Sequence, residues 1–318
     1  MDLDWIIFPS PYSSYTVDNC NGELIYVPLK FSSLNNEENE DKSESDNKVT
    51  SKDGNDKADT PEHIPCMLLR SSSQSLCQKY AIFFHGNAED INFAYEILNH
   101  IRFTLNINVI APEYPGYGIY PGRPSEEKIF ADSLSLYGYL TEILKISPKN
   151  IIVFGRSIGT SPAVYLASKK EMSALILISP LMSIRHVVKD ILGKLISYTF
   201  KEQFSSITLI EDVKCPILLI HGQNDNLIKY YHATELYNKA KVPCELILPE
   251  NMDHNEFDFF QEFSEPLLDF ISRNAIFANT QPTLLKIKKK LNKTPEIFKR
   301  PYKHWNILTK LLKKFSIN

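Results

Sequence analysis

The residues with the clearest chemical meaning lie in one pentapeptide, Gly155-Arg156-Ser157-Ile158-Gly159. Residues 151–154 before it are strand-forming, and residues 158–170 have the small and apolar side chains of a helix. A serine at a sharp strand-to-helix turn is a nucleophile elbow, in which the serine adopts a strained backbone conformation. Glycines two residues to either side leave room for the neighbouring strand and helix. We therefore predict that Ser157 is the nucleophile of an acyl-transfer enzyme.

Two further candidates follow in the chain order that this chemistry requires, which is serine, acid and then histidine. Asp225 comes shortly after the strand-like residues 216–220, and His254 follows the strand-like residues 244–248. Catalytic groups gather at the carboxyl ends of parallel strands. We predict that His254 takes the proton of Ser157 and that Asp225 orients the imidazole ring. The alternatives are that Asp225 only caps the following helix and that His254 is a surface-loop residue.

An oxyanion hole is predicted from the loop that follows the early strand-like residues 80–84. One backbone N–H of such a site comes from an early strand-to-helix loop, and the other comes from the residue after the nucleophile. We assign these two donors to Asn87 and Ile158. His85 lies too early in the chain to be the base and is expected to be structural. His221 is expected to form a hydrogen bond within its own turn.

The elements that must position these residues form an alternating series. Strands are expected at residues 81–84, 109–112, 151–154, 175–178, 217–220 and 245–248, and helices at 92–103, 126–145, 158–170, 230–240 and 256–272. This alternation predicts an α/β fold with a mainly parallel sheet and helices on both faces. Two antiparallel strands, residues 23–29 and 64–70, are expected before the series.

A short cap is predicted at residues 180–213, where only some thirty residues separate a strand from the next one. Its apolar residues are Ile191, Leu192, Leu195, Ile196 and those at 198–200. They are expected either to line an acyl groove or to pack in the core. A short cap is also expected to leave the serine accessible to a bulky substrate.

Several further motifs lie along residues 64–272. They include Ile64-Pro65-Cys66-Met67, His85-Gly86-Asn87-Ala88, Tyr114-Pro115-Gly116-Tyr117-Gly118, Gly122-Arg123-Pro124-Ser125-Glu126, Ser179-Pro180-Leu181-Met182-Ser183 and His221-Gly222 with Asp225. With these motifs and the pentapeptide, the chain resembles the alpha/beta hydrolase domain-containing protein 17 family. The resemblance implies an alpha/beta-hydrolase fold and a membrane-associated serine hydrolase that removes palmitate from S-acylated protein cysteines. Ser157, Asp225 and His254 match the family's catalytic triad.

Two alternatives to this function remain open. The residues do not distinguish a thioester from an oxygen ester, so a lipid esterase or monoacylglycerol-type lipase would use the same site. An alternative of another class is a catalytically idle adaptor at a membrane surface.

The chain departs from the family pattern at two places. It has Asn251, Asp253 and Asn255 around His254, where members usually have glycines. Residues 1–14 contain no cysteine, whereas animal members carry an acylated, cysteine-rich N-terminus. We therefore expect membrane targeting to differ from that of the animal members or to be absent.

Two segments outside the hydrolase pattern carry opposite charge. Residues 33–62 are acidic with almost no apolar side chains, which predicts a disordered insertion. Residues 276–318 are rich in lysine and predict two short basic amphipathic helices broken by Pro295 and Pro301. We favour an anionic membrane surface as the partner of this tail. One alternative is that the two helices pack on the hydrolase body, and the least favoured one is that the tail binds nucleic acid. The chain thus divides into four parts. The N-terminal strands are expected in residues 1–32, the insertion in 33–62, the catalytic core in 63–275 and the tail in 276–318.

The overall composition agrees with one catalytic domain. The chain has 318 residues, 43% of them hydrophobic, and its formal net charge of −3 hides the two oppositely charged segments. No apolar run approaches the ~20 residues that span a bilayer, and the start of the chain has neither a basic signal region nor a myristoylation glycine. The five cysteines have no metal-binding spacing and are expected to be reduced thiols. We expect a cytoplasmic protein that needs no cofactor and is able to lie on the cytoplasmic face of a membrane.

Overall fold

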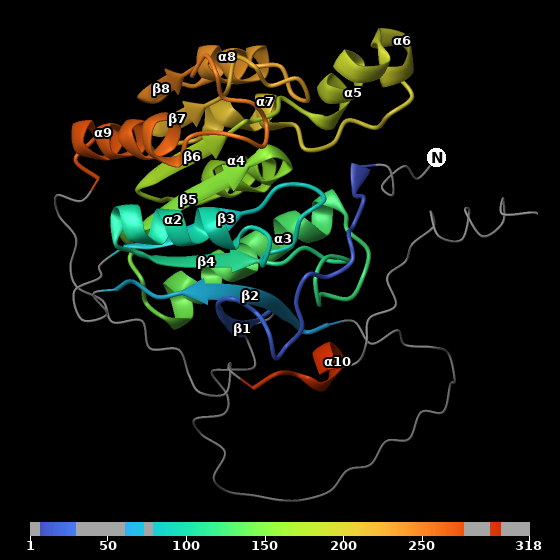
Figure 1. Cartoon of the computed structure of the whole chain (residues 1–318), viewed down its shortest axis with the longest axis vertical. Helices are drawn as coiled ribbons and strands as arrows, with labels where there is room; N and C mark the ends of the chain where they lie inside the picture. Colours follow the sequence, from blue (N-terminus) through green and yellow to red (C-terminus); the bar gives the residue numbers. More distant parts are fainter. Residues whose placement is uncertain (1–6, 30–60, 73–78, 277–292, 300–318) are drawn as a thin grey trace, which may run out of the picture.

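The computed structural model describes residues 7–29, 61–72, 79–276 and 293–299, and within these ranges the strands form one eight-stranded sheet (Figure 1). The strand order is β1-β2-β4-β3-β5-β6-β7-β8. Strand β2 pairs antiparallel with β1 and β4, and the remaining neighbours are parallel. The strands are β1 (Glu23–Pro28), β2 (His63–Leu69), β3 (Tyr80–Phe84), β4 (Asn108–Pro112), β5 (Ile151–Arg156), β6 (Ala174–Ile178), β7 (Ile217–Ile220) and β8 (Cys244–Ile247). The predicted mainly parallel sheet with an antiparallel start is confirmed.

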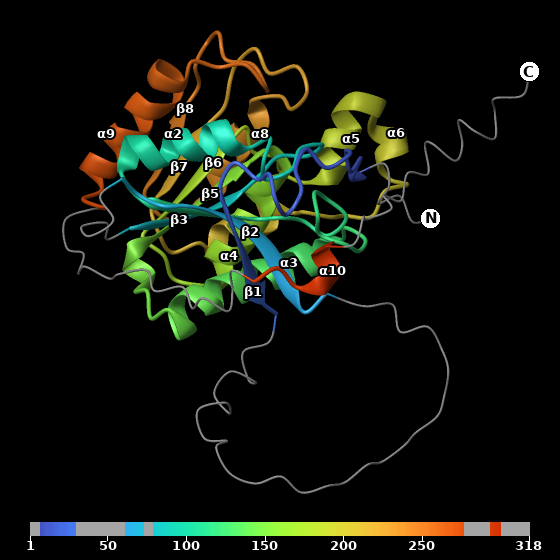
Figure 2. The ribbon, with the colours of Figure 1, turned by 60° about the horizontal axis from the view of Figure 1, so that its bottom comes forward.

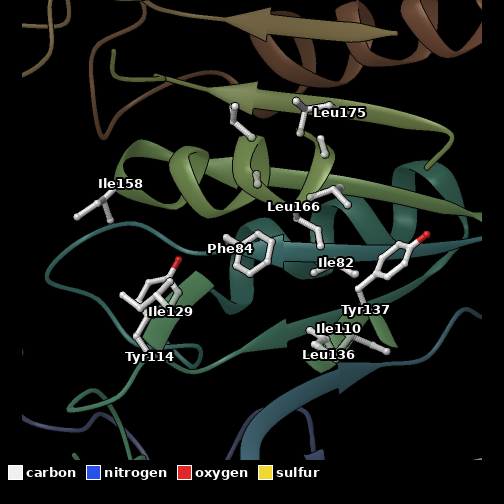
Figure 3. Close-up of a cluster of buried hydrophobic side chains, with 14 of the residues drawn as sticks. Ile82, Phe84, Ile110, Tyr114, Ile129, Leu136, Tyr137, Ile158, Leu166 and Leu175 are labelled. Atoms are coloured by element: carbon white, nitrogen blue, oxygen red, sulfur yellow. The ribbon is translucent and has the colours of Figure 1, made fainter. Parts of the chain in front are cut away.

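Helices cover both faces of this sheet, as predicted. Buried side chains of α3, α4 and α8 join one hydrophobic cluster with alternate strand residues such as Val153 and Leu175. Those of α2 and α9 join the cluster on the opposite face with the intervening strand residues such as Phe154 and Ile176. Figure 3 shows part of the first cluster. The helices are α2 (Tyr95–Leu105), α3 (Glu126–Gly138), α4 (Thr160–Lys169), α5 (Ile184–Leu192), α6 (Lys194–Ser197), α7 (Ser206–Leu209), α8 (Tyr231–Lys239), α9 (Glu265–Arg273) and α10 (Glu296–Lys299).

Two helices begin later than the sequence predicted, because aspartate side chains hold the preceding residues in turns. The carboxylate of Asp90 accepts the backbone N–H groups of Asn92 and Phe93 before α2 begins. The expected helix at residues 256–272 begins only after Asp258, with a π-helical turn at Phe259–Ser264 that leads into α9. Residues 256–258 therefore belong to the loop that carries His254.

The two charged segments lie largely outside the described residues. Of the predicted insertion, residues 33–60 are not described, so its expected disorder stays a prediction. Of the predicted tail, residues 276 and 293–299 are described. There α10 lies between the two prolines, where no helix was expected, and the ring of Phe298 stacks on Tyr26 of β1 with centroids 5.1 Å apart. This part of the tail is packed on the hydrolase body.

None of the helices in the described part of the chain is long and apolar enough to cross a bilayer.

Candidate active site

Ser157 lies at the turn between β5 and α4, as the pentapeptide predicted. Its φ angle is 53°, in the left-handed region that non-glycine residues rarely adopt. A Cβ atom added to Gly155 would lie 2.4 Å from the carbonyl oxygen of Gly159, and one added to Gly159 would lie 2.2 Å from that of Phe84. Since backbone atoms cannot give way, both positions require glycine for this turn to form.

The three predicted triad residues meet at the carboxyl edge of the sheet. The Nε2 atom of His254 is 3.0 Å from the Oγ atom of Ser157, and its Nδ1 atom is 2.7 Å from Oδ2 of Asp225. Asp225 is 2% exposed, Ser157 6% and His254 8%. The serine is thus more enclosed than the short cap led us to expect, because loops from three strand ends surround it.

Asp225 both caps the following turn and contacts His254, so the two interpretations of this residue are compatible. Its Oδ1 atom accepts the backbone N–H groups of Leu227 and Ile228 at 2.9 and 2.8 Å. Its Oδ2 atom faces His254 and also lies 3.2 Å from Nε2 of His221. Burial opposes ionisation of Asp225, but the hydrogen bonds from His221 and His254 outweigh it and hold its pKa well below the usual range. The carboxylate therefore stays charged at neutral pH and is able to orient the ring of His254.

The predicted oxyanion donors lie on two loops that touch each other beside Gly159. Ile158 is in the first turn of the helix, where backbone N–H groups have no intrahelical acceptor. Among the described residues, the backbone N–H of Asn87 has no acceptor. The side chain of Asn87 is fixed at both ends, since it donates to the carbonyl of Ile7 at 2.6 Å and accepts from the hydroxyl of Tyr117 at 2.7 Å. The loop is thus held while its N–H remains available for an oxyanion.

His85 and Glu113 form buried contacts beside the loop that carries Asn87. His85 is fully buried, stacks on Tyr114, and places Nε2 3.1 Å from Oε1 of Glu113. The other carboxylate oxygen of Glu113 accepts from the hydroxyl of Tyr15 at 2.9 Å. Burial lowers the pKa of His85, but the hydrogen bond and charge of Glu113 outweigh it, so the pKa is raised overall. These contacts agree with the structural role expected for His85.

Arg156 is a residue whose role sequence reasoning missed. Its Nη2 atom donates to the carbonyl oxygen of His254 and to Oδ1 of Asn255, both at 3.0 Å. Its Nη1 atom lies 3.3 Å from both carboxylate oxygens of Glu89, and Glu89 in turn accepts the backbone N–H of Gly86. Arg156 therefore joins the loop of the base to the oxyanion loop. The sequence signal for this role was an arginine side chain within residues 155–159, next to the serine, in a segment whose other residues are apolar or small.

The loop around His254 keeps its shape without the glycines that the family usually has. The Oδ1 atom of Asp253 accepts the backbone N–H groups of Asn255 and Glu256 at 2.7 and 2.8 Å. A Cβ atom on Gly222 would lie 2.0 Å from the carbonyl oxygen of Met252, so the loops of the acid and the base are in direct contact. The carboxylate of Asp253 is used in this turn, and the loop geometry follows from polar side chains in place of glycines.

Comparison with known proteins gives relatives of hydrolase type. No family model matches the chain. It is 36% identical over 210 residues to alpha/beta hydrolase domain-containing protein 17C of Xenopus tropicalis, covering 66% of this chain and 66% of that protein. It is 33% identical over 214 residues to alpha/beta hydrolase domain-containing protein 17B of Homo sapiens, covering 67% and 72%. The chain thus spans slightly less than two thirds of the length of the 17C relative.

Solved structures show the same fold. The Pyrococcus furiosus esterase Pf2001 superposes with a TM-score of 0.54 and 21% identity, covering 67% of this chain and 89% of that one. At this level of identity the likeness concerns the fold alone. The alternating β and α elements of the described residues are those of the alpha/beta-hydrolase fold, as predicted, with the loops of Ser157, Asp225 and His254 at one edge of the sheet.

Proposed function

Because the chain belongs to the alpha/beta hydrolase domain-containing protein 17 family, we propose that it is a serine hydrolase removing long-chain acyl groups from the cysteines of S-acylated proteins. That the chain is an alpha/beta hydrolase follows from its relatives and its fold. The observation that carries the serine-hydrolase part of the proposal is the hydrogen-bonded series from Ser157 through His254 to Asp225. Its distances are those that a nucleophile, a base and an orienting acid require. The choice of a thioester over an oxygen ester rests on the family resemblance.

In the proposed first step, Oγ of Ser157 attacks the carbonyl carbon of the thioester while Nε2 of His254 takes the serine proton. The negative charge that develops on the carbonyl oxygen is stabilised by the backbone N–H groups of Asn87 and Ile158. Ionised Asp225 stabilises the imidazolium. The carbon–sulfur bond then breaks, and His254 returns the proton to the departing thiol.

In the second step a water molecule attacks the acyl-enzyme. His254 takes a proton from the water, and the tetrahedral intermediate releases the fatty acid and restores Oγ of Ser157 to its protonated state. Each proton transfer uses the same nitrogen atom, Nε2, which faces the serine at 3.0 Å. No group outside the described site is needed for this sequence.

We further propose that the basic tail, residues 276–318, holds the enzyme on the cytoplasmic face of an anionic membrane. The lysine content of this segment supports the proposal, because each basic residue near such a surface contributes on the order of 1 kcal/mol to binding. The packing of Phe298 against Tyr26 places residues 293–299 of the tail beside β1 of the hydrolase body.

The test is labelling of the purified full chain by a fluorophosphonate probe, with an S-palmitoylated peptide or a monoacylglycerol as competitor. We expect Ser157→Ala to abolish labelling and to lower hydrolysis of the peptide by at least about a thousandfold. Ser168→Ala is the matched control, since within the described residues its hydroxyl bonds only to the carbonyl of Tyr165 on α4. Protection by the glyceride alone would support a lipase. Absence of labelling in a folded wild-type chain would overturn the proposal in favour of an idle adaptor.

A further inference from the structure

The cap carries a cluster of exposed apolar side chains that neither the core nor the active site explains. Helix α5 buries Ile184 at its start, but beyond its middle the apolar residues of α5 and α6 face solvent. Five of them, here called the cap surface, have these exposed fractions: Ile191 56%, Leu192 50%, Leu195 86%, Ile196 46% and Tyr198 64%. The expectation that they pack in the core is therefore wrong for these five residues, and of the predicted set only Phe200 is buried. The alternative, that they line an acyl groove, stays a prediction.

The cap surface projects from the hydrolase body. Figures 1 and 2 both show α5 and α6 standing out at one side of the sheet. The corner between them is Gly193, with a φ angle of 90°, where an added Cβ atom would meet nothing within 4 Å. Within the described residues nothing covers these apolar side chains, so we treat them as available to an external partner.

The projection is fixed to the body by polar contacts at its base. The Oδ2 atom of Asp190 lies 3.0 Å from Nε2 of the buried His232, and both carboxylate oxygens accept from the hydroxyl of Tyr231. The hydroxyl of Ser183 caps the start of α5 by accepting the N–H of His186. The apolar side chains are thus presented on a positioned helix pair.

The charge around the cap surface is positive. Residues 184–201 contain the basic residues Arg185, Lys189, Lys194 and Lys201 and one acidic residue, Asp190. Arg185 pairs with Glu202 at 3.3 Å, and Asp190 is engaged with His232. The three lysines are exposed and form no ion pair within the described residues. Exposed leucine and isoleucine with lysines beside them form the pattern that binds at the headgroup level of anionic membranes.

We propose that the cap surface is a membrane-docking site that inserts its apolar side chains into the headgroup region of an anionic lipid bilayer. Long lysine side chains can keep their charge at the phosphates while their stems lie along apolar surface, and tyrosine favours the membrane–water interface. A protein partner fits less well, because lysine is depleted in protein interfaces. The proposal goes beyond the hydrolase activity, since docking requires no turnover.

The cap is joined to the helix that follows Ser157. It returns to the body at Phe204, whose carbonyl oxygen accepts from the hydroxyl of Ser161 on α4 at 3.2 Å. If Ser157 acts on acylated proteins as proposed, docking would place the bilayer on the segment that contacts this helix. The short cap would then serve in membrane binding and would not act as a cover over Ser157.

The test is co-sedimentation of the purified full chain with vesicles of phosphatidylcholine alone or mixed with phosphatidylserine. We expect binding to the mixed vesicles, and a loss of at least about tenfold in the double variant Ile191→Ser with Leu195→Ser. The matched control is Phe260→Ser with Leu268→Ser, whose side chains are 61% and 43% exposed outside the cap. This control should bind as wild type does.

Two further variants separate charge from apolar insertion and cap from tail. The double variant Lys189→Glu with Lys194→Glu should bind the mixed vesicles more weakly than wild type does, with no change on vesicles of phosphatidylcholine alone. Added salt should reduce this difference between variant and wild type. A chain ending at residue 299 should keep a cap-dependent part of the binding. The proposal would be overturned if the Ile191 and Leu195 variant bound vesicles as wild type does, or if the control variant lost as much binding. It would also be overturned if removal of the tail alone abolished vesicle binding.

Fluorophosphonate labelling of the cap variants distinguishes failure of docking from failure of the proposed hydrolase. Labelling should be as in wild type, because the cap surface lies outside the triad. If the double variant changed from dimer to monomer in solution while vesicle binding stayed constant, the surface would be a contact between copies, and the docking proposal would be wrong.

Discussion

Replacing Arg156 tests whether the active site depends on one side chain that joins two of its loops. In Arg156→Ala, the loop of His254 loses two hydrogen bonds from a charged donor, to the carbonyl of His254 and to Asn255. Such bonds contribute roughly 1.5–3 kcal/mol each. The side chains of Arg156 and Glu89 are only 13% and 19% exposed, so solvent replaces little of what is lost.

The loop would still be held by its other contacts. Asn224 donates to the carbonyl of Met252 at 3.2 Å, and Asp225 keeps its hydrogen bond to the ring of His254. We therefore expect a loss of about 2–3 kcal/mol in the free energy of unfolding, smaller than the sum of the two bonds. A displaced base lowers the rate of the chemical step, and a shift of about 1 Å costs on the order of 100-fold.

The assay is steady-state hydrolysis of a soluble ester together with urea unfolding. If Arg156 acts only by positioning His254, we expect kcat to fall by about 10- to 100-fold with KM nearly unchanged. Arg156→Lys should recover only part of kcat, since one ammonium cannot match the guanidinium fork that reaches both loops.

The control is Arg273→Ala, which removes an exposed arginine paired with Glu245 outside the active site. It should leave kcat unchanged and alter stability little, because exposed ion pairs contribute little. The reasoning about Arg156 is refuted if Arg156→Ala keeps the wild-type kcat, or if it loses stability only as Arg273→Ala does.

Two other predictions follow from contacts near the sheet. In Gly159→Ala, the new Cβ atom would lie 2.2 Å from the backbone oxygen of Phe84, so thermal unfolding should show a loss of about 3 kcal/mol or more and fluorophosphonate labelling should disappear. Gly86→Ala should cost clearly less stability, because its nearest neighbour is the movable carboxylate of Glu89; equal losses would contradict the packing argument. Burial lowers the pKa of Lys79 to about 8. Above that pH the unfolded chain therefore binds more protons than the folded chain does. The free energy of unfolding should then rise by about 1 kcal/mol between pH 8 and 10, after allowance for solvent screening. In urea titrations Lys79→Met should remove this rise, and a persistent rise would show that Lys79 is not its source.

The sheet could be predicted from the sequence because its parallel strands are buried on both faces. Such strands have nearly continuous apolar runs, as in Ala174–Ile178, and their ends agree with the predicted ones to within two residues. The order of Ser157, Asp225 and His254 could be used because each residue closely follows a strand, and parallel strands bring their carboxyl ends together. Where local side chains compete with a helix, as Asp258 does, the predicted boundary was wrong by a few residues.

Arg156 and the cap could not be predicted because their roles depend on neighbours that are distant in the sequence. Arg156 contacts residues 67 positions before it and 98 positions after it. The apolar pattern of Ile184–Leu192 suits burial along its whole length. Whether a second layer covers its end depends on where the chain turns, and Gly193 turns it away from the body.

The site and the cap are therefore constrained by different contacts. The loops of the nucleophile, the base and the oxyanion donors are locked to one another by close backbone approaches at Gly155, Gly159 and Gly222 and by Arg156. A change at any of these places moves groups whose distances the chemistry fixes. The cap surface shares none of these contacts, so its side chains can change without altering the distances within the triad. If the proposed docking and mechanism hold, substitutions in the cap should change membrane binding, while the proposed proton transfers through His254 continue unchanged.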